Sequence, residues 1–536
     1  MGAASLKPAW AVLIALLLAL LVATLATDRA ARPPDAGEEP TYALQAASLA
    51  WDFDLQYSDE DFRRFRDQWG ARPRGIDLES QDGGRTQVYA RPFFHALVAA
   101  PFVRLMPERG MRVANALLLA AAALLAAWAL RAPLLVAAFV FASVTFSYVF
   151  LATADVFLLA VTAAGFALIY AGQREDPLPS VYEGERKWSW RVFGRWLAIG
   201  LLLAISGTYR LLYFFLLLPA AVALQKSVVR GRRAAWAGLI LGAAGLLAAG
   251  SFVHASAGGD PLLAPSVTFE PDPGLLVWNA VYFLVGRNVG ILPWFLPVLL
   301  ALAAARSDRG RWALGVGVAL AVLGFLVADP YDFAGVGGGA GNRLFLPLYP
   351  ALWFLAARPL RSGWVIAVAL LAAPFLLPLS PSVKERIEAW LPYELPYEVT
   401  QRDLPGAWIA QGSLRIKPTS PGVWKAPQGS DFRIAGGEGG ELVIASPDSL
   451  ERLELAFDRN APALLEVHGA ELRPTRLGAD GSVTFQVPLG SGRVHPMWWT
   501  GDRHHLYSLN FRLPGAPIKP IGFRVRPVRD LIQKTP

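Results

Sequence analysis

The chain lacks cysteine and carries little charge. Without cysteine in its 536 residues it forms neither disulfides nor thiolate metal sites, which excludes thiol-based redox chemistry. Charged residues make up only 17% of the chain, whereas a soluble protein needs roughly 25% to cover its surface. A Gly-x-Gly-x-x-Gly loop is also missing from the sequence, so no dinucleotide site is expected. These absences point away from soluble proteins and toward the membrane.

Apolar residues are abundant instead. They make up 54% of the chain, and the mean hydropathy is +0.38. Eleven apolar segments are candidates for crossing a bilayer, which takes about 20 residues of helix. The segments are 9–27, 110–130, 133–151, 156–172, 195–207, 211–225, 235–253, 289–305, 312–328, 343–357 and 363–379. We therefore predict a polytopic α-helical membrane protein with about eleven transmembrane helices.

Two of these assignments have alternatives. The segment 9–27 lies where a signal peptide would lie, but a signal peptide has an apolar region of only about 7–15 residues. The longer run therefore favours a retained helix. The segments 195–207 and 211–225 are short, and the polar stretch 206–210 separates them. A single long helix is the alternative there, and it would invert the orientation of every later segment.

The distribution of basic residues decides the orientation. With two separate helices and a cytoplasmic N-terminus, the inside loops hold 16 basic and five acidic residues, whereas the rest of the chain holds 34 and 37. This is the positive-inside pattern. Together with the Ala-, Leu- and Arg-rich composition, it predicts a bacterial inner-membrane protein with residues 380–536 in the periplasm or outside the cell. The isoelectric point of 9.7 thus reflects topology, and no nucleic-acid partner is expected.

The sequence predicts two domains. Residues 1–379 form a transmembrane domain, whose first external loop, 28–109, contains a helix at 42–50 and an interfacial helix at 92–106. Residues 380–536 begin with a Pro-rich junction and then alternate between apolar and polar positions, which predicts an external β-sandwich. Its expected strands are 442–444, 453–457, 464–467, 483–487, 507–511 and 523–525.

Acidic and basic side chains gather at the external membrane face in this topology. Glu38 and Glu39 follow the first helix, and Asp155 lies in the turn before the segment 156–172. The candidate ligands for an anionic substrate are Arg91, His95, Arg210, Asn342 and Arg343. Charged groups at the edge of an apolar bundle are costly, so such a gathering indicates a functional site.

The combination of acids and arginines suits sugar transfer from a polyprenyl-phosphate carrier. Arginine forks bind the phosphate and stabilise its charge as it leaves. A carboxylate removes the proton from an acceptor hydroxyl while the hydroxyl oxygen attacks the anomeric carbon. The expected partners are a polyprenyl-phosphate sugar, membrane lipid, and a glycan, lipid or protein acceptor. No cofactor is required, although a divalent cation is compatible with Asp52, Asp54, Asp59, Glu60 and Asp61.

Four segments resemble motifs of the GT-C glycosyltransferases, which include the protein O-mannosyltransferases and the bacterial aminoarabinose transferase. Residues 37–44, Gly-Glu-Glu-Pro-Thr-Tyr-Ala-Leu, are similar to the Asp-Glu motif of the first external loop. Residues 89–94 resemble the family's Lys-Pro-Pro-Leu-Tyr segment, and residues 153–156 resemble its acid at the start of helix four. Residues 342–350 resemble its Arg-Tyr-x-x-Pro-x-x-Pro helix start. The resemblance covers about residues 1–360.

This resemblance implies a GT-C helical bundle, an undecaprenyl- or other polyprenyl-phosphate sugar donor, and inversion at the anomeric carbon. The catalytic aspartate of the family falls on Glu38, the second acid on Glu39 and the family lysine on Arg91. Because Glu38 is one methylene longer than aspartate, a catalytically inactive relative is an alternative. A polysaccharide transporter or flippase is a further one, but charges at one face and the lack of internal repeats favour the enzyme. A structural envelope protein whose sandwich is the active part is a third.

Each candidate residue also has a simpler interpretation. Glu38 and Glu39 fit a solvated loop, and Asp155 fits a helix cap. Arginines at a membrane surface also contact lipid headgroups, and His95 fits interfacial packing. The glycine-rich run 335–341 lies in no strand–helix unit, so an external loop suits it better than a phosphate site. The pairs Trp498-Trp499 and His504-His505 fit a sugar platform or the sandwich itself equally well.

Overall fold

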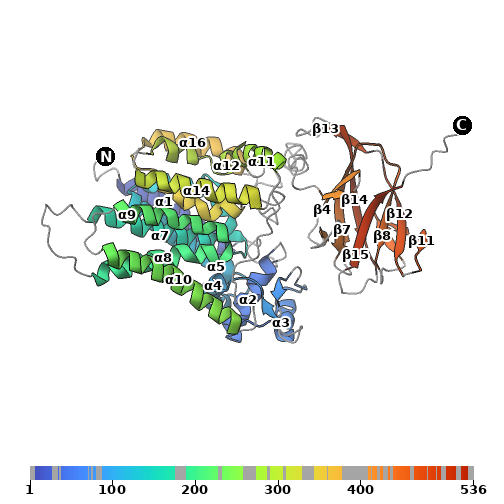
Figure 1. Ribbon diagram of the computed structural model, residues 1–536, viewed down its shortest axis with the longest axis horizontal. Coiled ribbons are helices and arrows are strands. Elements are labelled where there is room, and N and C mark those ends of the chain that lie inside the picture. The colour runs from blue at the N-terminus through green and yellow to red at the C-terminus, as the bar shows by residue number, and fades with distance from the viewer. Residues whose placement is uncertain are drawn as a thin grey trace. The chain divides into compact units, whose positions relative to one another are not determined.

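The computed structural model is a bundle of helices followed by a β unit (Figure 1). The chain divides into two compact units, Met1–Tyr393 and Glu394–Pro536. The residues described are 6–26, 34, 38–70, 72–73, 76–79, 87–175, 189–226, 232–256, 273–285, 290–305, 309–328, 343–358, 360–376, 409–411, 413–418, 423–425, 432–434, 439–458, 464–479, 481–490, 492–496, 503–514 and 521–528. Asn342, the run 335–341, Trp498 and Trp499 lie outside these ranges.

Within the ranges that the structure describes, five helices of the first unit are long and apolar enough to cross a membrane. They are α1 (Leu6–Ala26), α5 (Gly110–Leu130), α8 (Trp190–Tyr209), α10 (Arg232–Ser256) and α14 (Arg309–Ala328). A bent pair, α6 (Pro133–Phe141) and the 3-10 helix η3 (Val144–Phe150), becomes a sixth if it is counted as one span. Many large apolar side chains on these helices are exposed, as expected for surfaces that face lipid. The chain is therefore a multi-pass membrane protein.

Shorter helical segments complete the bundle. They are α7 (Asp155–Glu175), η4 (Leu211–Leu216), α9 (Leu217–Lys226), α11 (Pro273–Val285), α12 (Ile291–Trp294), α13 (Val298–Ala303), η5 (Arg343–Leu348), α15 (Tyr349–Trp353) and α16 (Ser362–Leu376). Each of the eleven predicted segments coincides with helical structure, but several are broken, and the number of spans stays a prediction. The break predicted at 206–210 is real, because α8 ends where Arg210 adopts an extended conformation. The helix α11 was not predicted.

Between α1 and α5, the described residues of the first unit form three helices and a pair of short antiparallel strands. They are α2 (Glu39–Trp51), α3 (Asp59–Trp69), β1 (Leu78–Glu79), β2 (Val88–Tyr89) and α4 (Phe94–Leu105). Pro40 in the first turn favours the start of α2, because the missing N–H has no partner there anyway. Ser58 and Asp61 form a reciprocal capping box at the start of α3, and Gly70 ends that helix in the left-handed conformation.

The second unit is a sandwich of two antiparallel sheets. One sheet has the order β10-β9-β14-β7-β4-β3, with β13 also paired to β14, and the other has the order β11-β12-β8-β15-β6-β5. The strands are β3 (Ile409–Gln411), β4 (Leu414–Pro418), β5 (Val423–Lys425), β6 (Phe432–Ile434), β7 (Gly439–Ser446), β8 (Arg452–Phe457), β9 (Leu465–Val467), β10 (Ala470–Leu472), β11 (Arg476–Leu477), β12 (Val483–Pro488), β13 (Arg493–Pro496), β14 (Arg503–Arg512) and β15 (Ile521–Pro527). Rings from both sheets, such as those of Phe511 and Phe523, meet in one apolar core.

The structure confirms the predicted fold class, a helical membrane bundle with a C-terminal β-sandwich. All six strands expected from alternation are present, and they supply much of the core. The strands that were not predicted are mostly short. The His504-His505 pair lies in the predicted strand β14, at the part of it that pairs with β13. His504 is buried and lies opposite His495 in the ladder, whereas His505 is half-buried and faces Val494. This pair is thus part of the sheet itself.

Candidate functional site

The start of α2 places the two adjacent glutamates in different surroundings. Glu38 occupies the N-cap position, and Glu39 is the first residue of the helix. The Glu39 side chain is buried, and its Oε1 accepts a hydrogen bond of 2.8 Å from the backbone N–H of Ala152. This bond joins α2 to the turn that precedes α7. The Glu38 carboxylate instead faces arginine side chains. The two adjacent acids therefore have different partners.

Arg343 connects two carboxylates from distant parts of the chain. Its Nε donates to Oδ2 of Asp155 at 2.9 Å, and its Nη2 donates to Oε2 of Glu38 at 2.8 Å. Asp155 begins α7 and also accepts a hydrogen bond of 2.6 Å from the Thr153 hydroxyl. Arg343 begins η5 and is almost completely buried. A buried guanidinium that pairs with two carboxylates fixes the ends of three segments relative to one another.

Arg91 forms the second link of the network. Its Nη2 lies 2.9 Å from Oε1 of Glu38. The same guanidinium donates to Oδ2 of Asp77 through Nε at 2.9 Å and Nη2 at 2.6 Å. The backbone of this stretch is held by α2, because Gln45 donates to the carbonyl of Arg91 and Thr41 accepts from the N–H of Asp77. Asp77, which the sequence did not single out, is therefore the third carboxylate of the site.

Arg210 contacts the carboxylates less closely than Arg343 and Arg91 do. It lies at the break between α8 and η4, and its Nη2 is 4.0 Å from Oε1 of Glu38. Within the described parts of the chain its guanidinium makes no hydrogen bond, and 31% of the side chain is exposed. Three residues later, the Tyr213 hydroxyl donates to the carbonyl of Leu344 at 2.6 Å, which holds Arg210 close to Arg343. We refer to Glu38, Asp77, Asp155, Arg91, Arg210 and Arg343 as the arginine–carboxylate cluster.

The electrostatics of this cluster are set by the arginines. Burial by itself would raise the pKa of Glu38. The guanidiniums outweigh burial and hold that pKa at about 2, with Arg343 contributing most, followed by Arg91 and Arg210. Burial lowers the pKa of Arg91, but the neighbouring acids, Glu38 first, raise it well above its ordinary value. Glu38 and Arg91 therefore stay charged at neutral pH.

An aromatic layer lies beneath the cluster and contains His95. The His95 ring packs edge-on against Tyr42 at 5.7 Å, and lies 5.8 Å from the ring of Phe157. Its Nε2 is 3.0 Å from Oδ1 of Asn115, and because Asn115 donates through Nδ2 to Leu151, the Nε2–H must donate. Burial raises the pKa of the Tyr42 hydroxyl well above its ordinary value, so the phenol stays protonated.

The structure thus brings together five of the eight residues predicted from the sequence. Glu38, Asp155, Arg91, Arg210 and Arg343 are neighbours. Glu39 adjoins them through the backbone of the turn, His95 lies one layer below, and Asn342 lies outside the described residues. The sequence did not indicate Asp77, nor the contact between the rings of Tyr42 and His95. Tyr42 follows Glu38 by four residues, which is the spacing of helix neighbours. Asp77 stands in a loop with no comparable signal.

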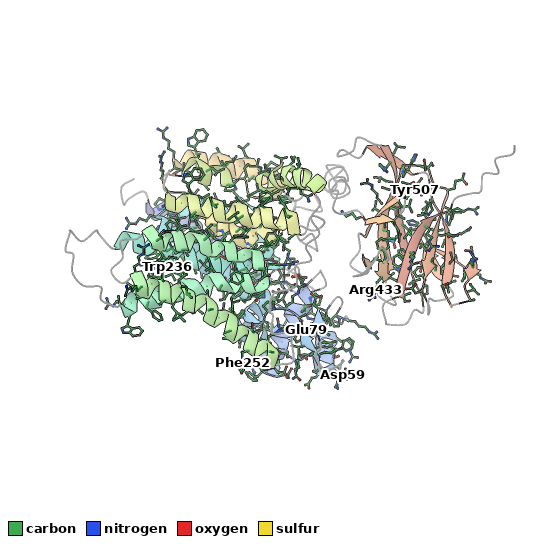
Figure 2. All side chains as sticks on the ribbon, in the orientation of Figure 1. Asp59, Glu79, Trp236, Phe252, Arg433 and Tyr507 are labelled. Atoms are coloured by element: carbon green, nitrogen blue, oxygen red, sulfur yellow. The ribbon has the colours of Figure 1, made fainter. Side chains whose placement is uncertain are left out.

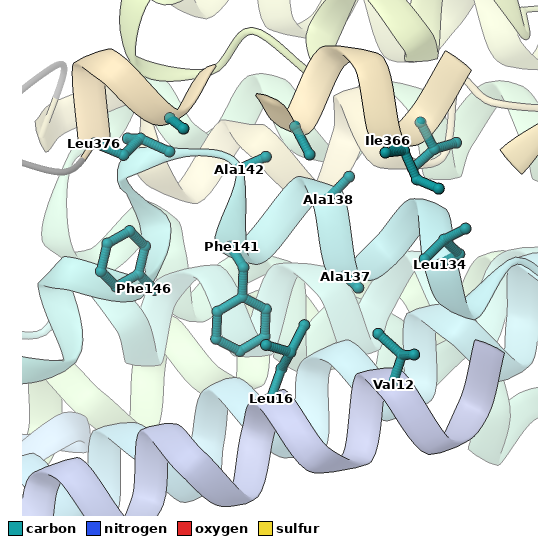
Figure 3. A pocket seen from close by; sticks show the side chains of 13 residues that line it. Val12, Leu16, Leu134, Ala137, Ala138, Phe141, Ala142, Phe146, Ile366 and Leu376 are labelled. Atoms are coloured by element: carbon teal, nitrogen blue, oxygen red, sulfur yellow. The ribbon is translucent and has the colours of Figure 1, made fainter. Parts of the chain in front are cut away.

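Neither described cavity includes a member of the cluster. The larger, about 330 Å³, is lined only by apolar side chains of α1, α6, η3 and α16, among them Val12, Phe141 and Ile366 (Figure 3).

The acidic residues of 52–61, which the sequence offered as ligands for a divalent cation, are partly paired with Arg64. Arg64 donates to both carboxylate oxygens of Asp52 and to Asp61. Among the residues that the structure describes, no three His, Cys, Asp or Glu side chains are grouped for a metal ion.

Chains of solved structures include some that are similar to this one. No protein-family profile and no curated protein sequence matches the chain. The crystal structure of ArnT from Cupriavidus metallidurans bound to undecaprenyl phosphate is similar, with 16% identity and a TM-score of 0.43. The match covers 69% of this chain and 64% of ArnT, so the chain spans less than two thirds of the protein it matches.

Proposed function

We propose that the protein is a glycosyltransferase of the GT-C architecture that transfers a sugar from a polyprenyl-phosphate donor to an acceptor hydroxyl. The observation that carries this proposal is the arginine–carboxylate cluster. It joins residues from four separate segments, among them Glu38 and Arg343, which are 305 positions apart and 2.8 Å from each other. Holding charged groups together at the edge of an apolar bundle is costly, and a structural role alone could be served by apolar packing.

The donor phosphate would bind first at Arg210. The guanidinium of this arginine makes no hydrogen bond within the described chain and is partly exposed, so its donors are available to an anion. Arg343 and Arg91 have further N–H donors beside those that bind the carboxylates. As the glycosidic bond to the phosphate breaks, the electron pair stays on the phosphate oxygen, and these guanidiniums stabilise the developing charge.

Glu38 would serve as the general base. It would accept the proton of the acceptor hydroxyl while that oxygen forms the new bond to the anomeric carbon, from the face opposite the leaving phosphate, with inversion. A carboxylate with a pKa of about 2 is a weak base. The negative charge of the bound phosphate offsets the arginines and raises the proton affinity of Glu38, so the base becomes effective only when the donor is present.

The test is a transfer assay with the purified full chain in lipid nanodiscs, using a set of radiolabelled polyprenyl-phosphate sugars. Glu38→Gln keeps the size and hydrogen bonding but removes the proton acceptor, which typically costs about 10²–10⁴-fold in rate. Glu60→Gln, an exposed acid on α3, is the matched control and should keep wild-type turnover. Transfer by Glu38→Gln at the wild-type rate would refute Glu38 as the base.

A catalytically inactive relative is the second candidate, and one observation favours it. Both carboxylate oxygens of Glu38 are engaged, Oε2 by Arg343 and Oε1 by Arg91. In that case polyprenyl phosphate would still bind and protect the protein from thermal unfolding, but no donor would be consumed. Donor binding without transfer across the whole set of sugars and acceptors would support this candidate over the enzyme.

A further inference from the structure

The helices α2 and α4 both begin beside the arginine–carboxylate cluster and end at an apolar tip. α2 starts directly after Glu38, and α4 starts three residues after Arg91. The two helices pack against each other. Two large apolar side chains stand at their C-terminal ends, Phe53, which is 79% exposed, and Leu105, which is 78% exposed. The tip is therefore connected to the cluster by two short helices.

The backbone at Phe53 is strained. Its φ of +59° is left-handed, and its N–H donates to the carbonyl of Ser48 at 3.0 Å, so it ends α2 at the position where glycine is preferred. A residue with a side chain is disfavoured in this conformation. The Phe53 ring has little packing within the protein, since 79% of the residue is exposed and the guanidinium of Arg104 lies 6.0 Å from the ring centre. Most of its apolar surface is therefore open to contact with something outside the chain.

The outward face of α4 continues the apolar tip. Leu97, Val98 and Leu105 are exposed on it, whereas the opposite face, with His95, Ala96, Ala99, Ala100 and Val103, is buried. The next helix, α5, begins five residues after α4 ends and exposes Leu117, Leu124 and Leu125 in the same way. Since α5 is one of the helices able to cross a membrane, α4 and the membrane helix that follows it both carry exposed apolar side chains.

Arg104 marks a polar boundary beside the tip. Its guanidinium lies 6.0 Å from the centre of the Phe53 ring, and its Nη1 donates to the carbonyl of Ala50 at 2.7 Å. A long basic side chain with its charge held above apolar neighbours is the arrangement found where proteins meet lipid headgroups. Figure 2 shows Phe252, another exposed ring, near the outer end of α10 and at the same end of the helical unit as Asp59 of α3.

We infer that Phe53 and Leu105, with Leu97 and Val98, form a membrane anchor that inserts into the acyl region of the outer lipid leaflet. The occupant of this surface is lipid, because the surface is apolar, belongs to a helix that is followed directly by a membrane helix and is bordered by an arginine. The anchor fixes the far ends of the two helices that carry the cluster. With a rise of about 1.5 Å per residue, α2 separates Glu38 from the tip by about 20 Å.

Depth measurements by spin labelling test this inference without any assay of sugar transfer. The chain has no cysteine, so Phe53→Cys and Leu105→Cys each give a single labelling site in the full-length protein. In liposomes of phosphatidylethanolamine and phosphatidylglycerol, nitroxides at both positions should collide more with oxygen than with a water-soluble nickel complex. Labels at Leu125→Cys on α5 and Glu60→Cys on α3 give the lipid and water references. Labels at 53 and 105 that match the water reference, or that neither reagent reaches, would overturn the anchor.

A second variant separates lipid contact from packing within the protein. Phe53→Gly relieves the left-handed strain, so its melting temperature in detergent should equal or exceed that of the wild type. In liposomes the same change should move a nitroxide at position 105 toward the water reference. A lower melting temperature in detergent would show that the Phe53 ring packs on the protein, and the inference would then be wrong. Neither readout depends on the proposed enzyme activity.

Discussion

The segment from η5 to α15 uses arginine in different ways at its two ends. At its start, Arg343 binds the carboxylates of Asp155 and Glu38. At its end, Arg311 from α14 donates 2.8 Å and 2.7 Å hydrogen bonds to the carbonyls of Phe354 and Ala356. The second arrangement needs no further explanation, because the last carbonyls of a helix lack partners and a cation there is favourable.

The first arrangement has no such local cause. The backbone at Arg343 does not require a nearby carboxylate. Placing Asp155, Glu38 and Asp77 around three arginines also brings carboxylates close to carboxylates and guanidiniums close to guanidiniums. The same residue type therefore has a structural role at one end and calls for a functional explanation at the other. Partners on the backbone indicate capping, whereas partners that are side chains from distant segments indicate a site.

Arg343→Ala is expected to have the largest effect. It leaves two carboxylates without their common partner, and breaking a buried pair typically costs about 3–5 kcal/mol. The melting temperature in detergent should fall by several degrees, and sugar transfer should disappear. Arg311→Ala is the matched control at the other end of the segment. It should lower the melting temperature through loss of the cap but keep the turnover of the folded protein. Equal turnover in Arg343→Ala and Arg311→Ala would show that the arginines at the two ends of the segment do not differ in function.

Glu38 makes the stability of the cluster depend on pH. Its pKa is lowered from 4.5 to about 2 in the folded protein, so folding favours the charged form. The contribution is complete above about pH 4.5 and is lost as the pH falls toward 2. At about 1.4 kcal/mol per pKa unit it amounts to a few kcal/mol. The gap in unfolding free energy between wild type and Glu38→Gln should therefore be constant from pH 7 to 5 and shrink below. A difference in unfolding free energy that grows as the pH falls would contradict the lowered pKa of Glu38.

Arg210→Ala should act on donor binding more than on folding. Loss of a charge-assisted hydrogen bond to phosphate is worth about 1.5–3 kcal/mol, or roughly 10- to 150-fold in the KM for the donor. The melting temperature without donor should change little, since the guanidinium of Arg210 makes no hydrogen bond within the described chain. Arg66→Ala, an exposed arginine on α3, is the control for loss of positive charge. If both variants bind the donor as tightly as wild type, the phosphate lies elsewhere.

The sequence predicted the parts of the molecule that repeat a simple pattern. Apolar runs located the helices of the bundle except α11, and alternation located six strands of the sandwich core, because both patterns reflect which face of an element is buried. Charge signs and topology then placed Glu38, Asp155 and Arg343 at one surface. The residues that depend on loop geometry were not predictable in this way. Asp77 reaches Arg91 only because α2 holds the backbone on either side, and no local pattern encodes that contact.

Glu39→Gln is expected to have the smallest effect, and it sharpens the contrast between two neighbouring acids. The amide keeps an oxygen that accepts from the N–H of Ala152, so the link from α2 to the turn before α7 survives. Turnover should stay within a few-fold of wild type, whereas Glu38→Gln should lose about 10²–10⁴-fold. Glu39→Ala removes the acceptor and leaves a buried N–H without its partner, at a cost of about 1–3 kcal/mol. It should therefore lower the melting temperature, and turnover should fall if the turn carrying Asp155 shifts. A Glu39→Gln variant as inactive as Glu38→Gln would show that the charge of Glu39 takes part in the chemistry, and the base would then have to be sought between the two.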